Sequence, residues 1–133
     1  MIWMQQEEIL EHAKLYTQQR KLVEREMEKL MYSLMELNNS LATLKEVKTE
    51  NGLVPIGGGA FLKAKLEGEK TLIPIGAGYM AEYSVKEAGE EVSKRIVLTE
   101  KAMGRMREEM DKIDAEMRKL EGEFRKHQHE SEG

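Results

Sequence analysis

The chain has 133 residues, of which 35% are charged, 40% are hydrophobic and only 5% are aromatic, and its formal net charge is −4. The length suits a single domain, expected to cover residues 1–133, and the composition favours long helices over a globular enzyme. The negative charge argues against nucleic acid as a partner, because a duplex is bound by clustered Lys and Arg side chains. The sequence has no Cys, which excludes disulfides and thiolate metal sites and suits a reducing cytoplasm. We expect no membrane partner either, since no apolar run approaches the roughly 18 residues that a span needs.

An apolar residue recurs at every seventh position through the N-terminal third of the chain. These positions are Ile2, Ile9, Tyr16, Val23, Leu30, Leu37 and Leu44. The residues four places later are apolar in the middle of the segment and polar towards its ends: Gln6, Ala13, Arg20, Met27, Leu34, Leu41 and Lys48. A 3.5-residue period keeps one stripe, the seam, facing a partner helix, so the pattern predicts a coiled-coil helix over residues 4–49.

The C-terminal third has the same alternating spacing of four and three residues. Its seam positions are Val92, Ile96, Thr99, Met103, Met106, Met110, Ile113, Met117, Leu120 and Phe124. Ser84, with Glu87 three residues later, has the form of a capping box at a helix start. The sequence therefore predicts a second coiled-coil helix over residues 85–129. In an antiparallel pair, the numbers of facing residues would sum to about 134, which places Ile9 beside Phe124.

The segment between the helices contains both prolines and an internal repeat. The residues from Val54 to Gly59 read VPIGGG, and 19 residues later those from Ile73 to Gly78 read IPIGAG. Each copy predicts a strand, a tight glycine turn and a second strand. We expect two β-hairpins with strands at 53–56, 60–66, 71–75 and 79–83.

Two isolated hairpins are marginal in water. They would leave Phe61, Leu72, Ile73, Ile75 and Tyr79 exposed in a monomer, so the hairpins are expected to assemble with those of other subunits. The predicted fold class is α+β, with a long antiparallel two-helix coiled coil joined by two hairpins (53–83) that build an oligomeric β-barrel hub. The residues expected to assemble the hub are Val54, Ile56, Phe61, Leu62, Leu72, Ile73, Ile75, Tyr79 and Met80.

This plan resembles the alpha class of archaeal prefoldin subunits. The specific likeness is the doubled Pro-Ile-Gly-x-Gly motif between Pro55 and Glu82, since the beta class has one hairpin here. The resemblance implies a hexamer of two alpha with four beta-type subunits, whose coiled coils hold non-native proteins at their distal tips. It implies transfer of these clients to a group II chaperonin without ATP, with no cofactor and no enzymatic activity. A filament-forming gamma-type relative shares the same plan.

The client-binding site is expected at the free ends of the two helices, where the apolar face widens. The residues assigned to it are Ile2, Trp3, Met4, Ile9, Leu10 and Phe124. Apolar contact is non-directional and Met side chains adapt easily, so such a patch suits many unfolded segments. The alternative is an N-terminus that is apolar by chance or docks on a neighbouring molecule. The polar tail 125–133 argues against strong client contact there.

Other motifs have simpler explanations. The methionines of the second helix lie on the seam, where they are expected to fill the core. His127 and His129 point to different faces of a helix, so no metal site is predicted. The glycine runs lack the P-loop pattern, and two helices enclose no pocket for paired carboxylates. Three functions remain open, namely a holdase, a structural filament subunit, and a coiled-coil tether for a folded partner.

Overall fold

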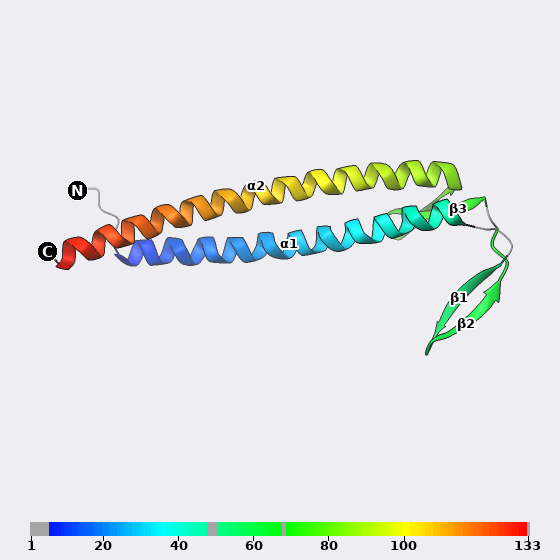
Figure 1. Ribbon diagram of the computed structural model, residues 1–133, viewed down its shortest axis with the longest axis horizontal. Coiled ribbons are helices and arrows are strands. Elements are labelled where there is room, and N and C mark those ends of the chain that lie inside the picture. Colours follow the sequence, from blue (N-terminus) through cyan, green and yellow to red (C-terminus); the bar gives the residue numbers. More distant parts are fainter. Residues whose placement is uncertain (1–5, 48–50, 68, 133) are drawn as a thin grey trace. The chain divides into compact units, whose positions relative to one another are not determined.

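The computed structural model describes residues 6–47, 51–67 and 69–132. Helix α1 (Gln6–Glu46) is followed by strands β1 (Gly52–Gly57), β2 (Ala60–Ala64), β3 (Lys70–Gly76) and β4 (Tyr79–Ser84), and then by helix α2 (Val85–Glu132) (Figure 1). β1 pairs with β2, and β3 with β4, as two separate antiparallel sheets. The predicted architecture of two long helices and two hairpins is confirmed. The expected helix start at Met4 lies outside the described residues.

The chain divides into two compact units, each with parts of both helices. Unit 1 consists of Met1–Tyr32 and Glu100–Gly133, and unit 2 of Ser33–Thr99. The two units are described separately below. That the whole chain acts as one domain stays a prediction.

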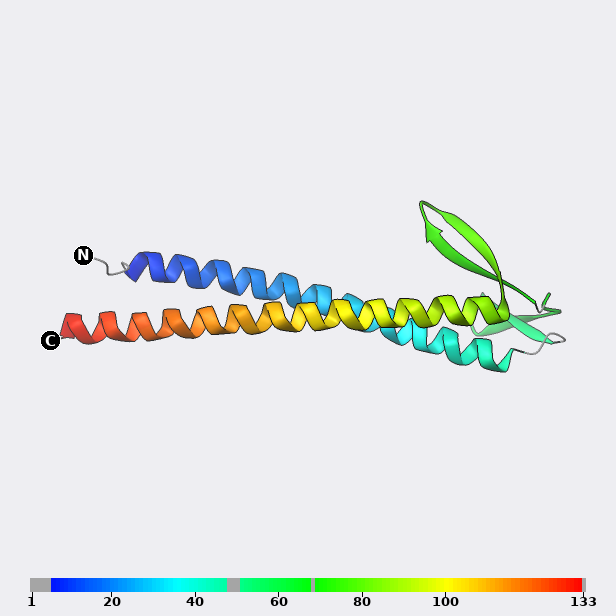
Figure 2. The same ribbon diagram turned by 90° about the horizontal axis from the view of Figure 1, so that it is seen from above.

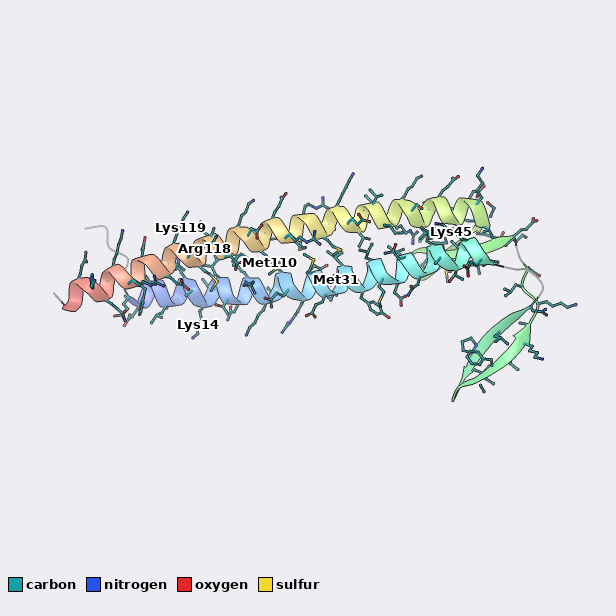
Figure 3. All side chains as sticks on the ribbon, viewed as in Figure 1. Lys14, Met31, Lys45, Met110, Arg118 and Lys119 are labelled. Carbon is teal, nitrogen blue, oxygen red and sulfur yellow. The ribbon has the colours of Figure 1, made fainter. Side chains whose placement is uncertain are left out.

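Unit 1 is an antiparallel helix pair closed by the predicted seam. The start of α1 and the end of α2 lie at the same end of this unit in both views (Figures 1 and 2). Its buried side chains all occupy seam positions: Ile9, Val23, Met103, Ile113 and Leu120. Charged side chains such as Lys14 and Lys119 project outward, whereas Met110 lies between the helices (Figure 3). Gln6 is the exception, because this polar seam residue at the start of α1 is exposed.

Unit 2 has a small core where the second hairpin packs on the helices. Ile73 of β3 is buried together with Ala88 and Val92 of α2. The partly buried residues around them are Leu37, Leu41, Leu44, Tyr83 and Ile96. α2 begins where predicted, and the Ser84 hydroxyl accepts a hydrogen bond from the Glu87 N–H at 3.1 Å. This cap satisfies one of the unpaired N–H groups at a helix start.

Both hairpins turn through two residues with positive φ. In the first hairpin these are Gly58 and Gly59, with φ of 59° and 78°; in the second they are Ala77 and Gly78, with φ of 53° and 80°. Two consecutive left-handed residues form a type I′ turn, which matches the twist of the strands. Each first strand also has a register shift before its turn, between Pro55 and Gly57 and between Pro74 and Gly76.

The strand boundaries agree with the sequence prediction to within one residue, except at the end of β2. This strand was expected to reach Leu66, but it ends at Ala64, which pairs with Gly52 at the start of β1. A Cβ on Gly52 would lie 2.9 Å from Cγ of Leu66. The Leu66 side chain therefore covers Gly52, and the chain leaves the ladder where β1 has no further residue to pair with.

Candidate functional site

Unit 1 contains an apolar groove, here called the terminal groove, between the start of α1 and the end of α2. Its volume is about 230 Å³. The residues that line it are Ile9, Leu10, Ala13, Met117, Leu120, Glu121, Phe124 and Arg125. Six of these eight side chains are apolar, and the two charged ones come from α2. Such a surface suits apolar side chains of varied shape, because packing against it needs no directional bond.

The structure brings together three of the six residues predicted to bind clients. Ile9 and Leu10 of α1 and Phe124 of α2 all line the terminal groove. They differ in accessibility, since Ile9 is buried, Phe124 is half-buried and Leu10 is 56% exposed. Ile9 thus forms the floor and Leu10 the accessible wall. Ile2, Trp3 and Met4 lie outside the described residues.

An ion pair crosses the seam of unit 1. Arg20 occupies a seam position, and its Nε donates a hydrogen bond of 2.9 Å to Oδ1 of Asp114 on α2. Its guanidinium also pairs with Glu24 one turn along α1. The hydrogen bond and the negative charge of Asp114 raise the pKa of Arg20 above its ordinary value. This pair matches the predicted antiparallel register, in which facing residue numbers sum to about 134, and a polar contact at a seam position helps to specify such a register.

Most residues predicted to assemble the hub are exposed on the hairpins. They are Val54, Ile56, Phe61, Leu62, Leu72, Ile75, Tyr79 and Met80. Exposed apolar side chains are common at interaction sites, and the role of these residues in assembly stays a prediction. Ile73 was expected to be exposed in a monomer, and this was wrong. It is 6% exposed, because β3 turns this side chain onto Ala88 and Val92.

Unit 2 contains a second groove, the hairpin groove, that the sequence did not predict. It measures about 530 Å³ and lies between α1, β3 and α2. It is lined by Glu36, Leu37, Asn39, Ser40, Thr43, Leu44, Thr71, Leu72, Ile73, Pro74, Val92 and Arg95. The heptad pattern predicts the seam between the helices, but it contains no information about β3 packing beside that seam. No sequence signal therefore predicted this groove.

The described residues offer no clear constellation for metal chemistry. Within the described ranges, no three His, Asp or Glu side chains gather as a metal site would require. Neither helix, over its described length, has an apolar stretch that would suit a bilayer span.

Comparison with known proteins identifies relatives of this chain. The family model described as Prefoldin subunit matches residues 16–130. Prefoldin subunit alpha 1 of Methanocaldococcus jannaschii is 33% identical over 89 residues, which cover 66% of this chain and 63% of that protein. Prefoldin subunit alpha 1 of Thermococcus kodakarensis is 34% identical over 95 residues, covering 68% of this chain and 65% of the relative. The matches thus span less than two thirds of the length of these curated relatives.

A solved structure has the same fold. The cryo-EM structure of a filamentous PFD from Methanocaldococcus jannaschii superposes with a TM-score of 0.72 at 24% sequence identity. The superposition covers 85% of this chain and 98% of that one.

Proposed function

This chain belongs to the prefoldin family, and from that premise we propose that it is an alpha-type subunit of a cytoplasmic, ATP-independent holdase. In this role it binds non-native proteins and passes them to a group II chaperonin, with no catalytic step. The similarity to two archaeal alpha subunits supports the subunit type. The proposed assembly partners are beta-type subunits, two alpha with four beta, joined through the hairpins.

The observation that carries the holdase proposal is the terminal groove. Its apolar walls come from both helices, and its accessible member, Leu10, is 56% exposed. A non-native protein differs from a folded one in exposing apolar side chains, and contact with such side chains gains about 25 cal/mol per Å² of apolar surface removed from water. A shallow apolar groove can bind many such segments weakly.

The proposal is tested by comparing two leucines of one helix. Leu10 lines the groove, whereas Leu15 is 57% exposed outside it. We expect Leu10→Ser to weaken binding of an unfolded client about fivefold, which corresponds to about 1 kcal/mol of lost apolar contact. Leu15→Ser should leave it unchanged. The readout is suppression of aggregation of a chemically denatured protein, with light scattering to verify that both variants assemble equally.

Equal loss in both leucine variants would mean that clients bind general apolar surface, not this groove. No loss in either variant would remove the terminal groove from the proposed function.

A filament-forming structural subunit is the second candidate. It is favoured by the likeness to a protein that is itself described as filamentous, although that likeness concerns the fold. A filament grows when heterologous contacts continue without closing. Absolute mass by light scattering separates the two: a closed complex formed on mixing with a beta-type subunit supports the holdase, and polymers that lengthen with concentration from this chain alone support the filament.

A further inference from the structure

We propose that the terminal groove of unit 1 selects aromatic side chains of non-native proteins, and that Ala13 is the residue that leaves room for them. This selectivity rests on the proposed holdase function and deepens it by naming the class of side chain that the site takes. Three features of the groove support it, namely the small size of Ala13, the volume of the groove, and the chemistry of Phe124 and Arg125 at its border.

Ala13 is the smallest residue at the seam positions of unit 1. The hydrogen bond between Arg20 and Asp114 fits the register in which facing residue numbers sum to about 134. By that register Ala13 faces the region of Glu121, and both residues line the groove. Neither helix therefore supplies a large apolar side chain at this level of the seam, and the groove is the space that remains.

This space is large enough for an aromatic ring. The groove has a volume of about 230 Å³, whereas an apolar cavity of about 150 Å³ is enough to bind benzene. Ile9 and Leu120 line the groove and are buried. A client ring placed against them would take the position of the side chain that Ala13 lacks. It would be removed from water there, which favours binding of any apolar group.

Two residues of α2 favour an aromatic ring over an aliphatic side chain. Phe124 lines the groove and is half-buried, and aromatic side chains attract each other through offset or edge-to-face contacts beyond the effect of burial. Arg125 also lines the groove, is exposed, and makes no ion pair with another described residue. Its guanidinium is therefore available to the face of a bound ring. An aliphatic side chain in the same space would gain from neither contact.

Filling the space with Ala13→Leu tests the role of Ala13. The probes are two labelled, disordered Gly/Ser-rich polypeptides that carry several copies of one guest residue, Phe in one and Val in the other. For the unchanged chain we expect the Phe polypeptide to bind about tenfold more tightly than the Val polypeptide, and Ala13→Leu should reduce this ratio to about twofold. Fluorescence anisotropy measures the dissociation constants, for the chain alone and mixed with a beta-type subunit.

The matched control is the same substitution at an exposed alanine of the same helix. Ala42 lines neither groove, so Ala42→Leu adds equal apolar surface and should leave the ratio unchanged. Urea unfolding verifies that both variants fold, and we expect Ala13→Leu to be at least as stable as the unchanged chain, because it fills the seam. A purely structural role of Ala13 would change the stability without changing the ratio.

The guanidinium provides a second test that does not depend on the fold of the Ala13 variant. Arg125→Gln should weaken binding of the Phe polypeptide about threefold and leave the Val polypeptide unaffected, since a cation–π contact at an exposed site contributes an effect of about that size. Lys126→Gln removes the same charge from an exposed neighbour that does not line the groove, and it should change neither dissociation constant.

The outcomes separate this inference from the proposed function. Equal weakening of both polypeptides by Ala13→Leu, or no weakening of either, would overturn the selectivity and leave the holdase proposal intact. An Arg125→Gln variant that matches Lys126→Gln would overturn the part assigned to the guanidinium. A chain that binds neither polypeptide, alone or mixed with a beta-type subunit, would overturn the proposed function together with the inference.

Discussion

The two hairpin turns differ at a single residue whose backbone is left-handed. Gly58 in the first turn corresponds to Ala77 in the second, where φ is 53°. The left-handed conformation costs an L-residue with a Cβ roughly 1–2 kcal/mol, a cost that glycine avoids. The chain therefore tolerates this local cost in the β3–β4 hairpin, which packs on its own helices. The turn of the β1–β2 hairpin has three consecutive glycines instead.

Replacing this alanine tests the penalty. We expect Ala77→Gly to raise the free energy of unfolding by about 0.5–1 kcal/mol, because relief of the left-handed Cβ exceeds the added flexibility of the unfolded chain. Ala81→Gly in β4 is the control and should lower it by about 0.5–1 kcal/mol, since this residue is in a strand. Urea unfolding of dilute protein measures both changes, and changes of the same sign would argue against a strained turn.

At the residue scale, the sequence predicted the burial of the seam positions well. It predicted their contacts less well. All described seam positions except Gln6 are buried or half-buried. Arg20 was recognised only as a polar interruption, because Asp114 lies 94 residues away and belongs to no seam position. A heptad pattern records which side of a helix is apolar, but an ion pair depends on the facing helix as well.

Helix α2 depends on burial for its stability, because its sequence contains three glycines. Gly89, Gly104 and Gly122 all lie within α2 and each costs about 1 kcal/mol relative to Ala. The seam compensates for them along the helix, and the cap at Ser84 fixes where α2 begins. The sequence located this start because a capping box depends on residues only three positions apart.

Loss of the cap should be measurable at this scale. Ser84→Ala removes the oxygen that accepts the Glu87 N–H, and we expect it to lower the free energy of unfolding by about 1 kcal/mol. Ser84→Asp should retain most of the stability.

Ser93→Ala is the matched control, because Ser93 is exposed inside the same helix. Alanine is the better helix former there, so this variant should be slightly more stable. Chemical denaturation followed by circular dichroism compares the three variants. An equal loss from Ser84→Ala and Ser84→Asp would show that the loss does not come from the missing hydrogen-bond acceptor.

The strand ends show the limit of local pattern. Residues 60–66 have the composition of one strand, yet β2 stops at Ala64 because β1 offers no partner beyond Gly52. The pairing partner decides where a strand ends, and hydrophobicity along a single strand does not contain that information.

At the scale of the whole molecule, the two copies of the repeat have different surroundings. Ile73 is 6% exposed against the helices of unit 2, whereas its counterpart Val54 is 44% exposed. The sequence could not predict this difference, since both positions read as the apolar residue before Pro-Ile-Gly. The second hairpin buries Ile73 against the helix of its own chain, whereas the equivalent side chain of the first hairpin, Val54, stays exposed.

This division predicts opposite effects for equivalent substitutions. Ile73→Ala should lower the free energy of unfolding by about 2–4 kcal/mol, because it leaves a cavity against Ala88 and Val92. Val54→Ala should change it by less than about 0.5 kcal/mol in the dilute chain. The same Val54 variant should weaken assembly, which light scattering over a concentration series measures. A Val54 variant that unfolds easily yet assembles normally would reverse the assigned roles of the two hairpins.

The methionines of the seam affect how this chain responds to oxidation. With no Cys in the sequence, methionine provides all of its oxidisable sulfur. Met103 is buried in the seam of unit 1, and Met106, Met110 and Met117 are half-buried beside it. A sulfoxide is polar and would have to be accommodated between two apolar helix faces. Oxidative damage should therefore accumulate first at exposed methionines such as Met80, and the helix pair should loosen only once oxidation reaches the seam, a lesion that methionine sulfoxide reductases can reverse.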